Sequence, residues 1–113
     1  MTKRKNGKVS PRKITKRNLE GMVEILKSLE ENGHFSDKEI IKMINAAGYQ
    51  VKSGGNHLII YSPDARPVET QYGKAVVISK GRRGRDSSHS VLLNVSRHIR
   101  DEYSDIIAQR NSY

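Results

Sequence analysis

Apolar residues recur at helical spacing between positions 18 and 31, and this pattern predicts a first helix. Asn18 suits the N-cap position, and Gly33 can end the helix. The apolar stripe consists of Leu19, Met22, Val23, Ile25, Leu26 and Leu29.

A second helix has a complete start signal. Ser36 and Glu39 have the spacing of a capping box, and Phe35 with Ile40 has the spacing of a hydrophobic staple. Gly48 can end the helix. Its apolar face is predicted to consist of Ile40, Ile41, Met43, Ile44 and Ala47.

Alternating apolar and polar residues then predict an antiparallel sheet of three or four strands. Residues 49–52 and 56–61 form the first two strands, and Pro63 begins a turn that reverses the chain. Residues 67–72 and 75–78 form either one bent strand or two short ones.

A final helix is expected to begin at Asp86, Ser87 or Ser88, with Leu92, Val95, Ile99 and Tyr103 on its apolar face. These elements predict an α+β fold in which helices pack on one face of the sheet. We expect a basic, flexible arm at residues 1–17, one domain at 18–104 and a C-terminal tail at 105–113. In this tail, residues 106–108 can pack as a last helical turn, and residues 109–113 are expected to be loose.

The charge of the chain points to an anionic partner. In 113 residues, 21 Lys and Arg outweigh 12 Asp and Glu, which gives a net charge of +9 and favours nucleic acid as the partner.

The composition excludes several other classes of site. The absence of cysteine excludes disulfides and thiolate sites, and no apolar run is long enough to span a membrane. A cytoplasmic location is the default expectation. Five tyrosines and one phenylalanine are few for an extended base-stacking surface.

Two basic segments are candidate phosphate-binding regions. The N-terminal arm is rich in Lys and Arg, and residues 79–86 form a basic, glycine-rich loop whose guanidinium groups match phosphate oxygens. Each segment can equally be a solvated surface. The nucleic-acid-binding candidates in them are Lys3, Arg4, Lys5, Arg12 and Lys13 in the arm, and Lys80, Arg82, Arg83 and Arg85 in the loop.

His57 is the candidate catalytic residue. It follows the glycine pair Gly54-Gly55 and opens an apolar strand, so its imidazole is expected on a rigid element beside a turn that allows close approach. A solvated or structural histidine is the alternative. Lys52 and Asn56 flank the turn as further candidates for binding nucleic acid.

No cofactor or metal site is expected, because no histidine or carboxylate cluster has ligand spacing. The remaining chemistry is metal-independent cleavage of a phosphodiester. RNA supplies its own nucleophile, the 2′-OH, and needs a base such as His57 with cations nearby. His89 is a candidate for the acid that protonates the leaving oxygen.

Three motifs stand out within residues 36–100: Ile40-Ile41-Lys42-Met43-Ile44 with Ala47-Gly48-Tyr49, Gly55-Asn56-His57 leading into Leu58-Ile59-Ile60-Tyr61, and Pro63-Asp64-Ala65-Arg66-Pro67-Val68. Together with the order of elements, they resemble the HicA family of mRNA interferase toxins. The resemblance implies a double-stranded-RNA-binding-like fold, α-β-β-β-α, with an extra N-terminal helix here. It also implies that Gly55 and His57 are the functional pair, and that RNA and a HicB-like antitoxin are partners.

Three functions remain open from the sequence. The first is a metal-independent RNA endonuclease that uses His57. The second is a non-catalytic nucleic-acid-binding protein of phage type with the same fold, which binds through its basic arm and loop. The third is an interaction module that recruits a partner strand to an edge of the sheet.

Overall fold

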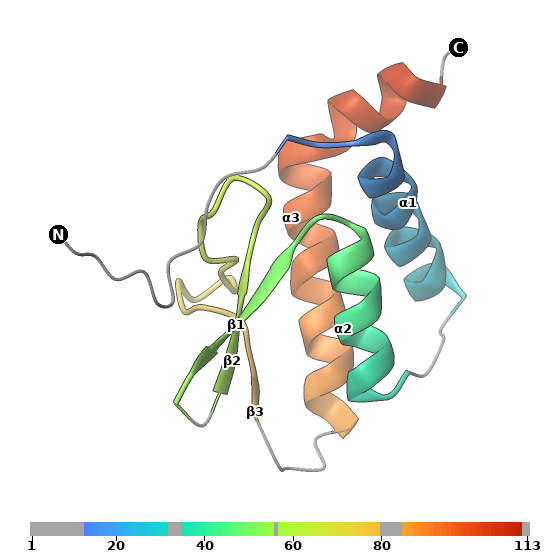
Figure 1. Ribbon diagram of the computed structural model, residues 1–113. Coiled ribbons are helices and arrows are strands. Elements are labelled where there is room, and N and C mark those ends of the chain that lie inside the picture. Colours follow the sequence, from blue (N-terminus) through green and yellow to red (C-terminus); the bar gives the residue numbers. More distant parts are fainter. Residues whose placement is uncertain (1–12, 32–34, 56, 80–84, 112–113) are drawn as a thin grey trace, which may run out of the picture.

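The computed structural model describes residues 13–31, 35–55, 57–79 and 85–111. They form an α+β fold with a three-stranded antiparallel sheet in the order β1-β2-β3. All three helices lie on one side of this sheet, with α2 and α3 against it and α1 outside them (Figure 1). The elements are α1 (Lys16–Glu30), α2 (Asp37–Ala46), β1 (Gln50–Gly54), β2 (His57–Tyr61), β3 (Val77–Ser79) and α3 (Arg85–Asn111).

Helix α1 begins earlier than the sequence pattern predicts. Its N-cap is Thr15, whose side chain accepts from the Asn18 backbone N–H, while the Asn18 side chain accepts from the Thr15 N–H, both at 3.0 Å. Asn18 is therefore the third residue of the helix, and the prediction that it is the N-cap is wrong. The predicted stop, Gly33, lies outside the described residues.

Helix α2 confirms its predicted start. The Glu39 N–H donates to Ser36 Oγ at 3.2 Å, and the Ser36 N–H donates to Glu39 Oε1 at 2.8 Å. The helix ends at Ala46, and Gly48 follows the C-cap with φ of 92°, a conformation that favours glycine.

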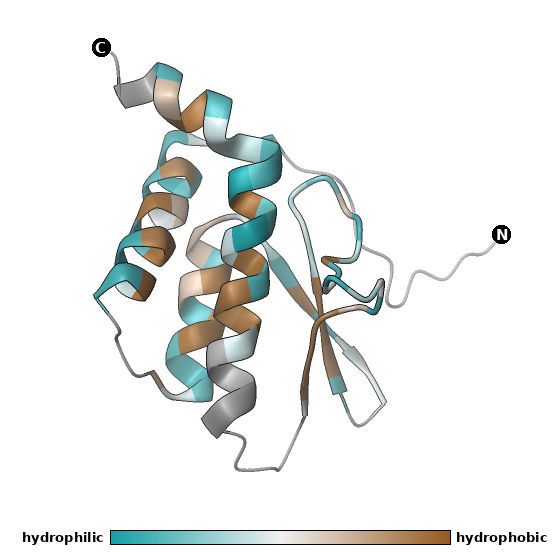
Figure 2. Cartoon of the chain, turned by 180° about the vertical axis from the view of Figure 1, so that it is seen from behind, coloured by the Kyte–Doolittle hydropathy of each residue, from teal (hydrophilic) through white to brown (hydrophobic). Residues whose placement is uncertain are grey.

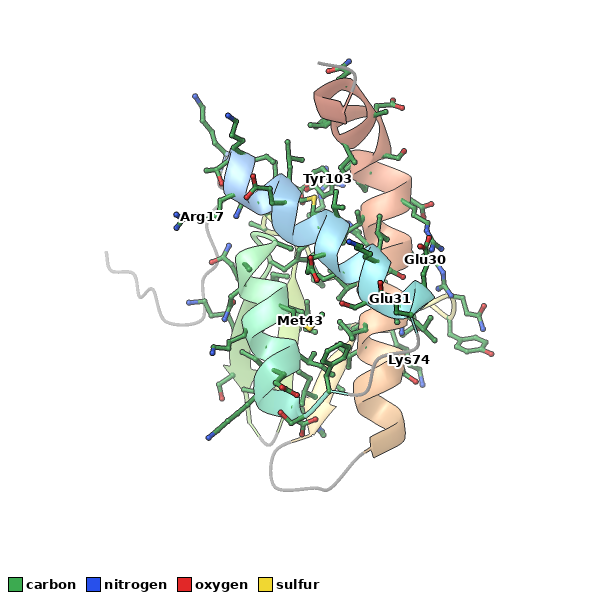
Figure 3. All side chains as sticks on the ribbon, turned by 90° about the vertical axis from the view of Figure 1, so that its right-hand side faces the viewer. Arg17, Glu30, Glu31, Met43, Lys74 and Tyr103 are labelled. Carbon is green, nitrogen blue, oxygen red and sulfur yellow. The ribbon has the colours of Figure 1, made fainter. Side chains whose placement is uncertain are left out.

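Helix α1 lies very close to the end of α2. The Asn18 side-chain amide donates to the Ala46 carbonyl at 3.2 Å and so satisfies one of the free carbonyls at that end. A Cβ on Gly21 would lie 2.7 Å from the Ala46 carbonyl carbon and oxygen. The two backbones can therefore meet only because residue 21 has no side chain. Figure 3 looks onto α1 in front of α2 and α3, with Arg17 at one end and Glu30 and Glu31 at the other.

One apolar core joins the three helices to the inner face of the sheet. The apolar sides of the helices turn toward each other and toward the strands (Figure 2). A fully buried Val, Leu, Ile or Met side chain contributes about 1.5–3 kcal/mol to stability, so this core is the main stabilising feature of the fold. Its best-buried members are Met22, Ile25, Ile40, Ile44, Tyr49, Ile60, Val68, Val91, Leu92, Val95 and Ile99.

The chain between β2 and β3 makes an excursion with little regular pairing. Isolated bridges join Tyr61 to Pro67 and Glu69 to Ala75, and β3 proper starts only at Val77. The stretch predicted at residues 75–78 is therefore confirmed in part, since Val77 and Ile78 belong to β3. The stretch predicted at residues 67–72 makes only isolated bridges, although Val68 is buried.

Helix α3 is longer than predicted at both ends. It begins at Arg85 and continues to Asn111, so it includes the last turn expected at residues 106–108. Residues 109–111, which were expected to be loose, are helical as well. Ile107 is part of the core, which explains why the helix continues past the predicted boundary at residue 104.

Candidate functional site

The turn between β1 and β2 places His57 at the rim of the sheet. Strand β1 ends at Gly54 and β2 begins at His57, and these two residues are paired in the sheet. Gly55 has φ of 74° and open space around the position of a Cβ, so its backbone conformation, rather than crowding, is what favours glycine there. His57 is exposed, so its imidazole is accessible to a large substrate.

Lys52 shares a face of the sheet with His57. Directly paired residues of antiparallel strands point to the same side, and the pairs here are Gly54 with His57 and Lys52 with Ile59. Lys52 is therefore a diagonal neighbour of His57, at a Cα separation of about 7 Å. The residue opposite His57 is a glycine, so no side chain of β1 stands between the imidazole and a ligand that approaches from this side.

This side of the sheet is not covered by the helices (Figure 1), and we call it the open face. Strand alternation places Ile60 and Ile78 in the core on the other side. On the open face the apolar side chains are half-buried and the histidine is exposed. We define the open face by its described side chains, Gln50, Lys52, His57, Ile59, Tyr61 and Val77, of which Gln50 is buried beside Tyr61. Ser79 also lies on this face, with only its backbone described.

The other predicted nucleic-acid-binding residues are placed only in part. Lys13 is exposed and precedes α1. Arg85 opens α3, and not the loop in which the sequence pattern placed it; only its backbone is described. The remaining ones lie outside the described residues: Lys3, Arg4, Lys5, Arg12, Asn56, Lys80, Arg82 and Arg83.

A polar cluster that the sequence did not reveal lies on the helical side. Tyr49 Oη lies 2.7 Å from His98 Nδ1, and the two rings meet edge to face with centroids 5.5 Å apart. The ring of Tyr103 lies 5.9 Å from that of His98. Burial raises the pKa of Tyr49, which therefore stays a neutral phenol, and burial likewise raises the pKa of Tyr103 to about 12.

His98 makes the folding stability depend on pH. Burial lowers its pKa from 6.5, although the nearby Glu102, Asp64 and Asp101 act in the opposite direction and Arg66 acts with burial. The unfolded chain therefore binds the proton more readily than the folded one. The contribution of His98 to stability is complete above about pH 6.5 and is lost as the pH falls through its lower folded-state value.

We therefore expect wild type to lose more unfolding free energy than His98→Gln between about pH 7.5 and about pH 5. The glutamine side chain does not titrate, and every other ionisable group is common to both proteins. Urea unfolding followed by circular dichroism at the two pH values measures the difference. An equal loss in both proteins contradicts this role of His98.

Within residues 13–31, 35–55, 57–79 and 85–111, no group of three or more acidic or histidine side chains is arranged to hold a metal ion. No helix in the same ranges is both long and apolar enough to cross a bilayer.

No family model, curated protein or solved structure matches the chain.

Proposed function

We propose that this protein is a metal-independent RNA endonuclease of the HicA toxin type, with His57 as its acid–base group. The observation that carries the proposal is the exposed imidazole at the rim of the open face, opposite Gly54 and diagonal to Lys52. A large polymeric substrate can reach this position, whereas it cannot reach a histidine packed among helices.

The reaction uses a nucleophile that RNA itself supplies. His57 takes the proton of a ribose 2′-OH, and the 2′-oxygen forms a bond to the adjacent phosphorus. The bond from phosphorus to the 5′-oxygen of the next nucleotide breaks, and this oxygen takes a proton from water. The products are a 2′,3′-cyclic phosphate and a free 5′-OH. Gly55 keeps the backbone beside the reaction open, and Lys52 stabilises the additional negative charge on the phosphate.

The element order supports the finer parts of the proposal. The series α2, β1, β2, β3 and α3 corresponds to the α-β-β-β-α order of a double-stranded-RNA-binding-like domain, with α1 as an additional N-terminal helix. In this proposal the partners are RNA and a HicB-like antitoxin, and the site of action is the cytoplasm. The net charge of +9 favours binding to the RNA backbone.

One observation favours the alternative, a non-catalytic nucleic-acid-binding protein. The described side chains next to His57 on the open face are those of Lys52, Ile59 and Val77, and none of them can act as an acid dedicated to the leaving oxygen. Ser79 pairs with His57 from β3, but only its backbone is described. In that case the basic N-terminal arm and the basic segment at residues 79–86 bind the phosphate backbone, and His57 is dispensable.

Cleavage of matched oligonucleotides tests the proposal directly. We expect the full chain to cut single-stranded RNA in the presence of EDTA and to leave the 2′,3′-cyclic phosphate, detectable by mass spectrometry. The same sequence with 2′-O-methyl groups should remain intact, because its 2′-oxygen cannot lose a proton. Binding without cleavage favours the alternative, and cleavage of the methylated strand contradicts the mechanism.

A further inference from the structure

The open face carries an apolar strip that the proposed chemistry does not use. Ile59 and Tyr61 follow His57 on β2 at alternate positions, and Val77 pairs with Ile59 from β3. All three are half-buried. No helix lies over β2 and β3 on this side of the sheet (Figure 1). Tyr61 lies between Gln50, its partner on β1, and Pro67, its partner on the other side.

We propose that unpaired RNA lies along β2 on the open face, with one base stacked on Tyr61 and a phosphate held by Lys52. The inference rests on the proposed function and assigns its substrate as single-stranded. Residues 57 and 61 are about 13 Å apart along the strand, a distance that a few extended nucleotides cover. Lys52 lies beside the middle of this path, opposite Ile59.

The chemistry favours a single strand over a duplex. Attack by the 2′-oxygen requires it to lie in line with the leaving 5′-oxygen, and the regular backbone of an A-form helix holds these atoms out of line. Unpaired bases also expose their flat faces, which aromatic side chains bind with little dependence on sequence. Stacking of one base requires one aromatic ring, and Tyr61 supplies it at a few nucleotides' length from His57. The low aromatic content of the chain therefore does not exclude base stacking here.

The charge of the face agrees with an RNA occupant and limits its path. Lys52 and His57 are the basic groups among the described residues that define it, and the whole chain carries +9. Glu69, which is exposed two residues beyond Pro67, carries the opposite charge. A phosphate backbone is therefore favoured between His57 and Tyr61 and disfavoured beyond Tyr61.

Binding measured in a His57→Ala background tests the inference without cleavage. Fluorescence anisotropy with a labelled single strand and with its duplex should show tighter binding of the single strand. Adding Tyr61→Leu keeps an apolar side chain of similar size but removes the ring, and it should weaken single-strand binding by about 5-fold or more. Tyr61→Phe should bind as the parent does.

Tyr72→Ala is the matched control, because Tyr72 is 79% exposed in the 70–74 turn and is not among the residues that define the open face. Its affinity should equal that of the parent. Equal binding by Tyr61→Leu, an equal loss in Tyr72→Ala, or preference for the duplex overturns the inference. Self-association of the chain that Tyr61→Leu abolishes would assign the face to a second copy and also overturns it.

The two proposals fail in different ways. If wild type does not cleave RNA but Tyr61→Leu weakens single-strand binding, the nuclease proposal is wrong and the assignment of the face stands. If wild type cleaves RNA and Tyr61→Leu binds as the parent does, the assignment is wrong and the nuclease proposal stands.

Discussion

Replacement of His57 by alanine is expected to lower the rate of RNA cleavage by about 10²–10⁴-fold, the usual contribution of a general acid–base group. The thermal midpoint should stay close to that of wild type, because the imidazole is exposed and its loss removes no core contact. Single-turnover cleavage under excess enzyme measures the chemical step separately from RNA binding.

A matched control separates this effect from a general change of the surface. Lys42 is exposed on α2, on the helical side of the sheet, and Lys42→Ala should cleave RNA at the wild-type rate. Unchanged cleavage by His57→Ala contradicts the assigned role. A parallel loss of rate and thermal midpoint would show that His57 acts through folding instead.

Gly21→Ala is expected to destabilise the protein by about 2 kcal/mol, although alanine favours an isolated helix by about 1 kcal/mol. The added Cβ would lie 2.7 Å from the carbonyl group of Ala46 and 2.8 Å from the backbone nitrogen of Ala47. Backbone atoms cannot rotate away as a side chain can, so α1 must move outward. That movement also stretches the bond from the Asn18 amide to Ala46.

Urea denaturation measures this loss as a change in the unfolding midpoint at constant slope. Glu24→Ala is the matched control, because Glu24 is exposed on the same helix and its replacement adds no contact with α2. Its stability should lie within about 0.5 kcal/mol of wild type. A Gly21→Ala protein that is as stable as wild type, or more stable, contradicts the close approach of the two helices.

The best-predicted element is α2, because its start depends on residues close together in sequence. Ser36 and Glu39 satisfy each other's backbone groups without help from the rest of the fold. The start of α1 follows the same geometry, but with Asn18 in the third helical position, where Glu or Gln is the usual signal. The basic residues Lys16 and Arg17 also made this turn resemble part of the arm.

The elements predicted least well depend on distant contacts. The sequence places the domain boundary at residue 104, but Ile107 packs in the shared core and α3 continues to Asn111. Tyr49 and His98 are 49 positions apart, so their hydrogen bond cannot be predicted without knowing the fold. That His57 shares a face with Ile59 and Tyr61 follows, in contrast, from the alternation along β2 alone, because the period of two is a local property.

Because the helices cover only one side of the sheet, amino-acid replacements on the other side can leave the core undisturbed. The hydrophobic interior lies between the sheet and the helices, while Lys52, His57 and Tyr61 occupy the opposite surface. Replacements at these three positions leave the interior intact. New substrate preferences can therefore accumulate there, by natural drift or by directed evolution, with little of the folding penalty that usually accompanies altered activity.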